Sequence, residues 1–145
     1  MPEFRRRRVA WSDAAVLSDP PVRLVPMALN IGMVTFDSLN PLPLAQWWEH
    51  ALGGKIVENL GGFFVMVAQA NGAAPNLGFQ TVPDPTPGKN RIHVDLGSTD
   101  RKADVERLVA DGATLIAEHD ENPGFAWTTL ADPEGNQFCV SDAQQ

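Results

Sequence analysis

The stretch GGKIVE at residues 53–58 returns as GATLIAE at residues 112–118, and this repetition decides the fold. In each half the stretch follows a segment with helical spacing of apolar residues and begins a strand-like segment. A Gly-Phe pair at residues 62–63 returns at residues 124–125, again at an offset of about sixty positions. A repeat of this length constrains the whole topology, so two copies of one structural unit are predicted.

Each half shows the same order of patterns, which is a strand, a helix and then three strands. The strand patterns cover residues 28–36, 55–59, 63–69 and 76–82 in the first half and residues 91–97, 113–118, 125–131 and 136–141 in the second. The helical patterns cover residues 42–52 and the segment from Thr99 or Asp100 to Gly112, which is expected to bury Val105, Leu108 and Val109. The predicted fold class is α+β, with two βαβββ modules.

The composition limits the class of protein. A chain of 145 residues is long enough for one domain, and its 43% hydrophobic and 20% charged residues are typical of a globular fold. The net charge of −7 disfavours nucleic acid as a partner, and no apolar stretch is long enough to cross a membrane. Since the single cysteine, Cys139, excludes an intrachain disulfide, a cytoplasmic protein is predicted.

The beginning of the chain differs from the rest. Residues 1–26 lack sustained periodicity and contain an arginine run at residues 5–8 and the pair Pro20-Pro21. This pattern predicts a flexible N-terminal extension, followed by one domain over residues 27–145. Two alternatives stay open, which are a translation start at Met27 and a tail that contacts a partner.

The predicted strand at residues 91–97 places two polar side chains on one face. Alternation sends His93 and Asp95 to the side opposite the apolar residues of that strand. Polar groups on an inner face must bond to protein, water or a ligand. The same rule sends Cys139, in the predicted strand at residues 136–141, to the inner face.

Three motifs stand in order along the chain: KNRIHVDL at residues 89–96, GAT at residues 112–114 and DPEGNQFCV at residues 132–140. With them, residues 27 to about 142 resemble the vicinal oxygen chelate superfamily of glyoxalase and bleomycin-resistance type, in particular glyoxalase-like proteins of actinobacterial kind. The resemblance implies strands that curve into an open cup for a small molecule, with the helices outside, and a homodimer. Asp132 to Gly135 is interpreted as a structural turn.

The resemblance also implies where a metal would bind. Metal-dependent relatives hold a divalent ion with four inward side chains, and the corresponding positions here are Gly32, Gln80 (or Gly78 after a register slip of two), His93 and Cys139. Gly32 has no side chain, and Cys139 stands where a glutamate is usual. A cup without a metal cofactor is therefore expected. If a divalent metal binds, its expected ligands are His93, Gln80 and Cys139.

An aromatic wall is expected beside the polar groups. Trp127 shares a strand face with Phe125 and Thr129 and could line the cup opposite the histidine. Phe36 and Phe63 are further candidates for this wall.

The remaining tryptophans and histidines have simpler interpretations. Trp47 and Trp48 are adjacent on a helix, and core packing is expected for them, with a rim or dimer contact as the alternative. His50 and His119 are expected to be surface residues.

Three functions stay open. The preferred one is a metal-independent binding protein for an aromatic or heterocyclic small molecule, as in bleomycin-resistance relatives. The second is a metal-dependent glyoxalase or other lyase, an epimerase or a dioxygenase with His93 as chief ligand. The third is a metal-free enzyme in which His93 is a general base oriented by Asp95. The expected ligand-binding residues are Phe36, Phe63, Gln80, His93, Asp95, Trp127 and Cys139.

Overall fold

The computed structural model describes residues 29, 31–121, 124 and 126–143. The chain divides into two units, Met1–Asn30 and Ile31–Gln145. In the first unit only Leu29 is described, and it lies outside any helix or strand. The predicted extension over residues 1–26 and the predicted wall residue Phe125 lie outside the described residues.

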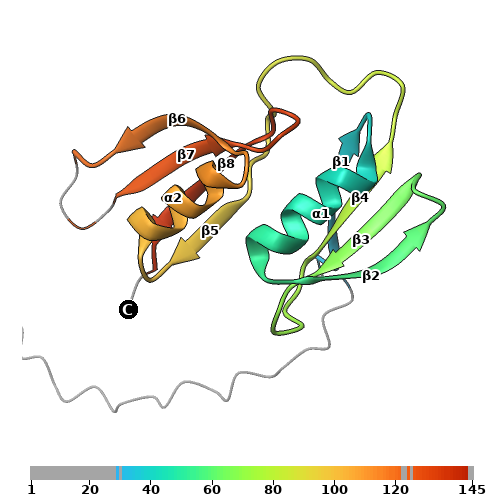
Figure 1. Cartoon of the computed structure of the whole chain (residues 1–145), viewed down its shortest axis with the longest axis horizontal. Helices are drawn as coiled ribbons and strands as arrows, with labels where there is room; N and C mark the ends of the chain where they lie inside the picture. The colour runs from blue at the N-terminus through green and yellow to red at the C-terminus, as the bar shows by residue number, and fades with distance from the viewer. Residues whose placement is uncertain (1–28, 30, 122–123, 125, 144–145) are drawn as a thin grey trace, which may run out of the picture. The chain divides into compact units, whose positions relative to one another are not determined.

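The first module of the second unit is a four-stranded sheet with one helix packed on it (Figure 1). Its elements are β1 (Met33–Ser38), α1 (Pro41–Leu52), β2 (Lys55–Leu60), β3 (Phe64–Ala68) and β4 (Asn76–Thr81). The strands lie in the order β1-β4-β3-β2. β1 runs parallel to β4, and the other neighbours are antiparallel.

The second module repeats this arrangement. Its elements are β5 (Asp95–Ser98), α2 (Arg101–Ala110), β6 (Thr114–His119), β7 (Trp127–Ala131) and β8 (Gln137–Asp142). The order β5-β8-β7-β6, with β5 parallel to β8, matches that of the first sheet. The predicted α+β class with two βαβββ modules is confirmed. No helix within the described ranges is long and apolar enough to cross a membrane.

The repeated sequence stretch has the same structural role in both modules. Gly53 ends α1 in the left-handed conformation, at φ 57°, which glycine adopts without steric cost. The edge strand that follows is irregular at the same place in each copy. Its register shifts between Ile56 and Glu58 in β2 and between Leu115 and Ala117 in β6. The sequence repeat therefore records a helix end followed by a bulged edge strand.

Two strands begin later than predicted, β1 at Met33 instead of residue 28 and β5 at Asp95 instead of residue 91. Ahead of β5, the side chain of Asn90 takes the place of strand pairing. Its amide accepts a bond from the backbone N–H of Gln137 and donates one to the Gln137 carbonyl. Ile92, predicted to lie on the apolar face, is 81% exposed because it precedes the strand.

Helix α2 begins as predicted and ends earlier. The side chain of Asp100 caps it by accepting a bond from the backbone N–H of Ala103. The helix ends at Ala110, two residues before the predicted stop. Val109 is 42% exposed, contrary to prediction, because the buried face of the helix centres on Val105 and Leu108.

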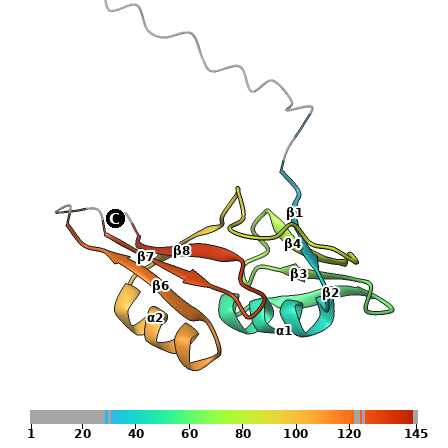
Figure 2. The ribbon, with the colours of Figure 1, turned by 90° about the horizontal axis from the view of Figure 1, so that it is seen from above.

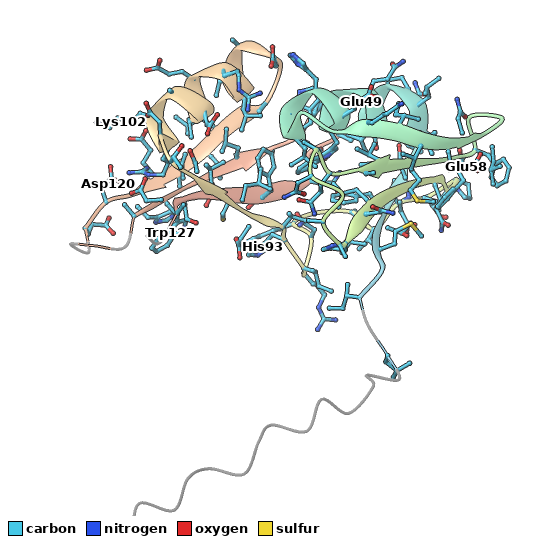
Figure 3. All side chains as sticks on the ribbon, turned by 90° about the horizontal axis from the view of Figure 1, so that it is seen from below. Glu49, Glu58, His93, Lys102, Asp120 and Trp127 are labelled. Atoms are coloured by element: carbon cyan, nitrogen blue, oxygen red, sulfur yellow. The ribbon has the colours of Figure 1, made fainter. Side chains whose placement is uncertain are left out.

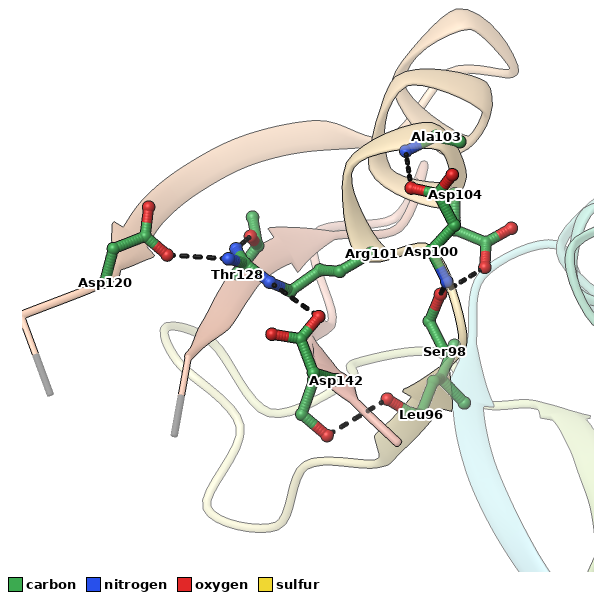
Figure 4. A network of polar contacts seen from close by, with 10 residues as sticks. Leu96, Ser98, Asp100, Arg101, Ala103, Asp104, Asp120, Thr128 and Asp142 are labelled. Atoms are coloured by element: carbon green, nitrogen blue, oxygen red, sulfur yellow. Dashed lines mark hydrogen bonds and ion pairs between the residues drawn. The ribbon is translucent and has the colours of Figure 1, made fainter. Parts of the chain in front are cut away.

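The buried Arg101 joins the start of α2 to three strands of its sheet (Figure 4). Its guanidinium donates to Thr128 of β7 at 2.8 Å and to Asp120, just after β6, at 2.7 Å. Its Nε lies 3.4 Å from a carboxylate oxygen of Asp142 in β8. One planar cation therefore holds together, from the helix side, the end of β6, the start of β7 and the end of β8.

Each helix covers one face of its own sheet, and the opposite face carries no helix (Figure 2). The covered faces share one core, to which α1 contributes two tryptophans. The rings of Trp47 and Trp48 lie 5.8 Å and 5.0 Å from that of Phe138 in β8. Trp48 is fully buried, so the prediction of core packing is confirmed. Helix α1 of the first module thus packs on a strand of the second.

A buried carboxylate completes this junction. Asp132 accepts hydrogen bonds from the Trp48 indole N–H at 3.0 Å, from the backbone of Glu134 and from the backbone and side chain of Asn136. The Gly135 N–H donates to the Asp132 carbonyl, which confirms the predicted structural turn. Burial raises the pKa of Asp132 above its ordinary value, although these bonds lower it in part. Its contribution to stability therefore declines as the pH rises through that raised pKa.

Replacing Asp132 by asparagine should destabilise the protein by about 1–3 kcal/mol, because an amide NH₂ would face donors that now meet an oxygen. Urea unfolding measures the change as a lower midpoint at unchanged slope. The matched control is Asp84→Asn at an exposed linker position, which should leave the midpoint unchanged. Equal midpoints for both variants would show that the turn does not hold the modules together.

Candidate functional site

Two rows of side chains cross the helix-free face of the second sheet. Residues two apart in a strand point to the same face, so paired strands align such rows. Read from β5 across β8 to β7, the rows are Asp95-Cys139-Thr129 and Gly97-Ser141-Trp127. The first row carries reactive groups, and the second carries two small residues beside an indole.

A hollow of about 560 Å³ opens over these rows. It is large enough for a small molecule. Its floor is low because Gly97 and Ser141 project little, and Trp127 borders it. In Figure 3, His93 and Trp127 lie on the side of the sheet away from the helices. The residues that line it are His93, Asp95, Gly97, Trp127, Cys139, Ser141, Asp142 and Ala143.

The first module carries larger side chains at the corresponding positions. The row that matches Gly97-Ser141-Trp127 is Asp37-Gln80-Phe64. There, the Gln80 side-chain amide donates to the Asp37 carboxylate at 3.2 Å. Asp37 and Gln80, bonded to each other, stand where the second module has the smaller residues Gly97 and Ser141. The same backbone therefore leaves more room over this row in the second module.

His93, Asp95 and Cys139 form one cluster, as the alternation of the sequence predicted. Their imidazole nitrogen, carboxylate oxygen and sulfur all lie within 4.8 Å of one another. His93 and Asp95 are exposed, and Cys139 is partly buried. The backbone holds the cluster, since the Cys139 N–H donates to the Val94 carbonyl at 3.0 Å. The hydroxyl of Thr129 lies 3.5 Å from the Cys139 sulfur.

The indole of Trp127 is supported by a histidine. The ring of His119 stacks on it, with centroids 4.4 Å apart and planes inclined by 17°. His119 and Trp127 are partners across β6 and β7, and His119 is partly buried. The sequence interpretation of His119 as a surface residue missed this contact, which depends on strand register. His50, in contrast, is exposed on α1, with its Nδ1 3.1 Å from an Asp111 carboxylate oxygen.

Three of the predicted site residues lie elsewhere. The Phe36 ring stacks on Phe79 with centroids 5.1 Å apart and belongs to the core beside α1. Phe63 is 61% exposed and lies in the turn between β2 and β3. Gln80 lies in the first sheet, bonded to Asp37. The structure thus gathers His93, Asp95, Trp127 and Cys139 at one hollow and places the other three residues away from it.

A second, more apolar hollow of about 300 Å³ adjoins the first at His93 and Asp95. The two residues border both spaces, so one ligand could contact both. The remaining lining residues are Val34, Leu52, Gln69, Pro75, Leu77, Val94 and Leu96.

Sequence reasoning did not single out Gly97, Ser141 and Asp142, which line the larger hollow. Gly97 carried a usable signal, because a glycine inside a strand often marks close approach of a ligand or another chain. Asp142 carried none, since its place beside the hollow depends on how β8 pairs with β5 and β7.

Comparison with known proteins agrees with this architecture. Residues 33–141 match the family model described as glyoxalase-like domain. A comparison with curated proteins found no match.

Several solved structures share the fold at low sequence identity. A glyoxalase/bleomycin resistance protein/dioxygenase family enzyme from Burkholderia phytofirmans PsJN is 18% identical, with a TM-score of 0.68 over 80% of this chain and all of that one. A bleomycin resistance determinant encoded on the transposon Tn5 is 15% identical, with a TM-score of 0.61 over 81% of this chain and all of that one.

A lactoylglutathione lyase from Agrobacterium tumefaciens is 16% identical, with a TM-score of 0.58 over 78% of this chain and 92% of that one. Identities this low establish the shared fold alone. The family match spans both modules, from the first residue of β1 nearly to the end of β8. The chain therefore belongs to the glyoxalase-like domain family.

Proposed function

We propose that the protein binds an aromatic or heterocyclic small molecule in the hollow beside Trp127. The observation that carries this proposal is the Gly97-Ser141-Trp127 row, which leaves room next to an indole face. Aromatic ligands stack on such faces, and a few polar groups orient them. Asp95, Ser141 and His93 would supply the polar contacts. These contacts need no metal. We also propose that the protein acts in the cytoplasm, because its single cysteine cannot form an intrachain disulfide.

The stacked pair formed by Trp127 and His119 strengthens the proposal. The stacked His119 ring holds the indole in place, so a ligand that binds beside Trp127 costs that side chain little conformational freedom. The similar protein encoded on the transposon Tn5 is a bleomycin resistance determinant. The proposal for this chain draws on that structural similarity together with the hollow.

Replacing Gly97 by leucine should weaken ligand binding by about tenfold or more, which corresponds to about 1.4 kcal/mol. The new side chain would occupy the hollow, and its Cβ meets only the Cβ of Ala143, at 3.9 Å. Binding is measured by titrating a panel of aromatic and antibiotic scaffolds into chelator-treated protein while following tryptophan fluorescence.

Gly32→Leu is the matched control, because a Cβ there meets nothing within 4 Å and the position lies outside the hollow. It should bind like the unaltered protein. A flat response of the unaltered protein across the panel, or equal affinities for both variants, would contradict the proposed site.

A catalytic role of the same hollow is the second candidate, favoured by the cluster of His93, Asp95 and Cys139. The chemistry would be that of a lyase, an epimerase or a dioxygenase, or a metal-free proton transfer in which His93 is the base and Asp95 orients it. Replacing His93 by alanine should abolish turnover in assays for these reactions. The control is His50→Ala on the exposed side of α1. Turnover that survives His93→Ala would remove this candidate.

We also propose a homodimer, supported by large apolar side chains left exposed beside the sheets, among them Ile31, Met33 and Ile92. Light scattering should give about twice the 15.7 kDa chain mass. Ile92→Asp should shift the mass toward the monomer, because a charge would be buried at the contact. Val109→Asp on α2 is the control and should leave the dimer intact. A monomer at every concentration tested would contradict this proposal.

A further inference from the structure

The ligand set that the superfamily uses for a divalent metal does not fit this chain. Gly32 offers no donor atom, and the side chain of Gln80 is bonded to Asp37 in the first sheet. Gly78, the alternative after a register slip, has no donor either. A side chain there would meet the Met33 sulfur at 2.9 Å and the Thr35 hydroxyl at 3.0 Å. The first module therefore supplies no convincing ligand at these positions.

The second module contains a different set of donors. We infer that His93, Asp95 and Cys139 form a three-ligand site for a thiophilic divalent ion, of which zinc is the natural example. Asp95 replaces the ligands of the first module, so that all three donors come from β5 and the residues just before it and from β8. The site opens into the hollow, which leaves a fourth position for water or a ligand.

Distances and strand pairing support this site. Donor atoms of a tetrahedral zinc site lie about 3.5 Å apart, given bonds of about 2.0–2.3 Å. The three donor atoms here lie within 4.8 Å of one another, so they must move about 1 Å closer together when a metal binds. The His93 and Asp95 side chains are exposed and can rotate by that amount, whereas strand pairing holds the backbones of Asp95 and Cys139 beside each other across β5 and β8.

The donor types select the metal. Zinc accepts imidazole nitrogen, carboxylate oxygen and thiolate sulfur together, whereas magnesium and calcium require oxygen ligands. The Thr129 hydroxyl, 3.5 Å from the Cys139 sulfur, can donate to the thiolate and orient it.

Local charge also favours a cation. The hollow is lined by two carboxylates, Asp95 and Asp142, and no lysine or arginine stands among its described lining residues. Asp142 is partly compensated by Arg101 on the helix side of the sheet, at 3.4 Å. Asp95 has no comparable cation among the ion pairs of the described ranges. A bound divalent ion would neutralise it.

Cobalt(II) titration of the full chain tests the inference without any substrate. One cobalt ion per chain should bind, and it should give a thiolate-to-cobalt charge-transfer band in the near ultraviolet that zinc removes. Cys139→Ser should abolish that band. Asp95→Asn and His93→Ala should each weaken cobalt binding by about tenfold or more, since even partners that only orient a ligand are worth that much.

Gln80→Ala is the decisive control. It removes the predicted family ligand and should leave cobalt binding unchanged if the site is confined to the second module. Absence of the charge-transfer band, or a band that persists in Cys139→Ser, would overturn the inference. Weaker binding in Gln80→Ala would overturn the confinement to one module and show a site built as in metal-dependent relatives.

The metal site and the proposed ligand binding can fail separately. Ligand binding is followed in chelator-treated protein and depends on Gly97 and Trp127, whereas cobalt binding is followed without ligand and depends on Cys139 and Asp95. Saturable fluorescence quenching without a cobalt band would leave the proposed function standing and remove the metal site. A cobalt band without saturable fluorescence quenching would leave the metal site standing and remove the proposed ligand binding.

Discussion

The packing of Trp48 against Phe138, closed by the bond from the indole to Asp132, is the contact on which the candidate site depends. Phe138 and Cys139 are neighbours in β8 and point to opposite faces of the sheet. The contact that seats Phe138 in the core therefore also sets where the Cys139 thiol stands on the open face. Asp132 extends this control to β7, because it holds the turn between the two strands. One buried junction thus positions two of the three strands beneath the hollow.

Arg101 has a similar effect at the other end of these strands. Its guanidinium contacts Thr128 and Asp142, each next in sequence to a residue that lines the hollow, Trp127 and Ser141. The hollow is therefore set between two buried polar anchors that both lie on the helix side. Phe138 and Thr128, which hold the strands, are buried in the core, whereas Cys139, Ser141 and Trp127 line the hollow on the other face. Asp142 takes part in both, because it pairs with Arg101 and also lines the hollow. Substitutions on the open face can change the ligand while the anchors stay intact.

The sequence predicted the duplicated fold because its signals are local. A glycine that ends a helix and an edge strand with a bulge leave the same letters in both halves. His93, Asp95 and Cys139 were found by strand alternation, which is also local. Phe36 was placed among the cup residues, yet in β1 the side chains of Val34 and Phe36 pack toward the core and Met33 and Thr35 face the other way. A shift of one residue reverses every side chain of a strand, and tertiary packing decides it. The contact of His119 with Trp127 was missed because it depends on register between strands.

The comparison of the two open faces explains how one duplicated backbone can carry a site in a single module. In the first sheet, Gln80 and Asp37 bond to each other beside Phe64 and occupy the row with their own atoms. In the second sheet, the matching positions are Ser141 and Gly97 beside Trp127, so the aromatic residue is kept and the filling is removed. In the adjacent row, the first module has Thr35-Gly78-Met66 and the second has Asp95-Cys139-Thr129. Here the second module has the additional functional groups, a carboxylate and a thiol that can hold a proton or a metal. Space and reactive groups therefore arise in the same module by substitutions that leave the strand pairing untouched, which is how a site can change while its fold persists.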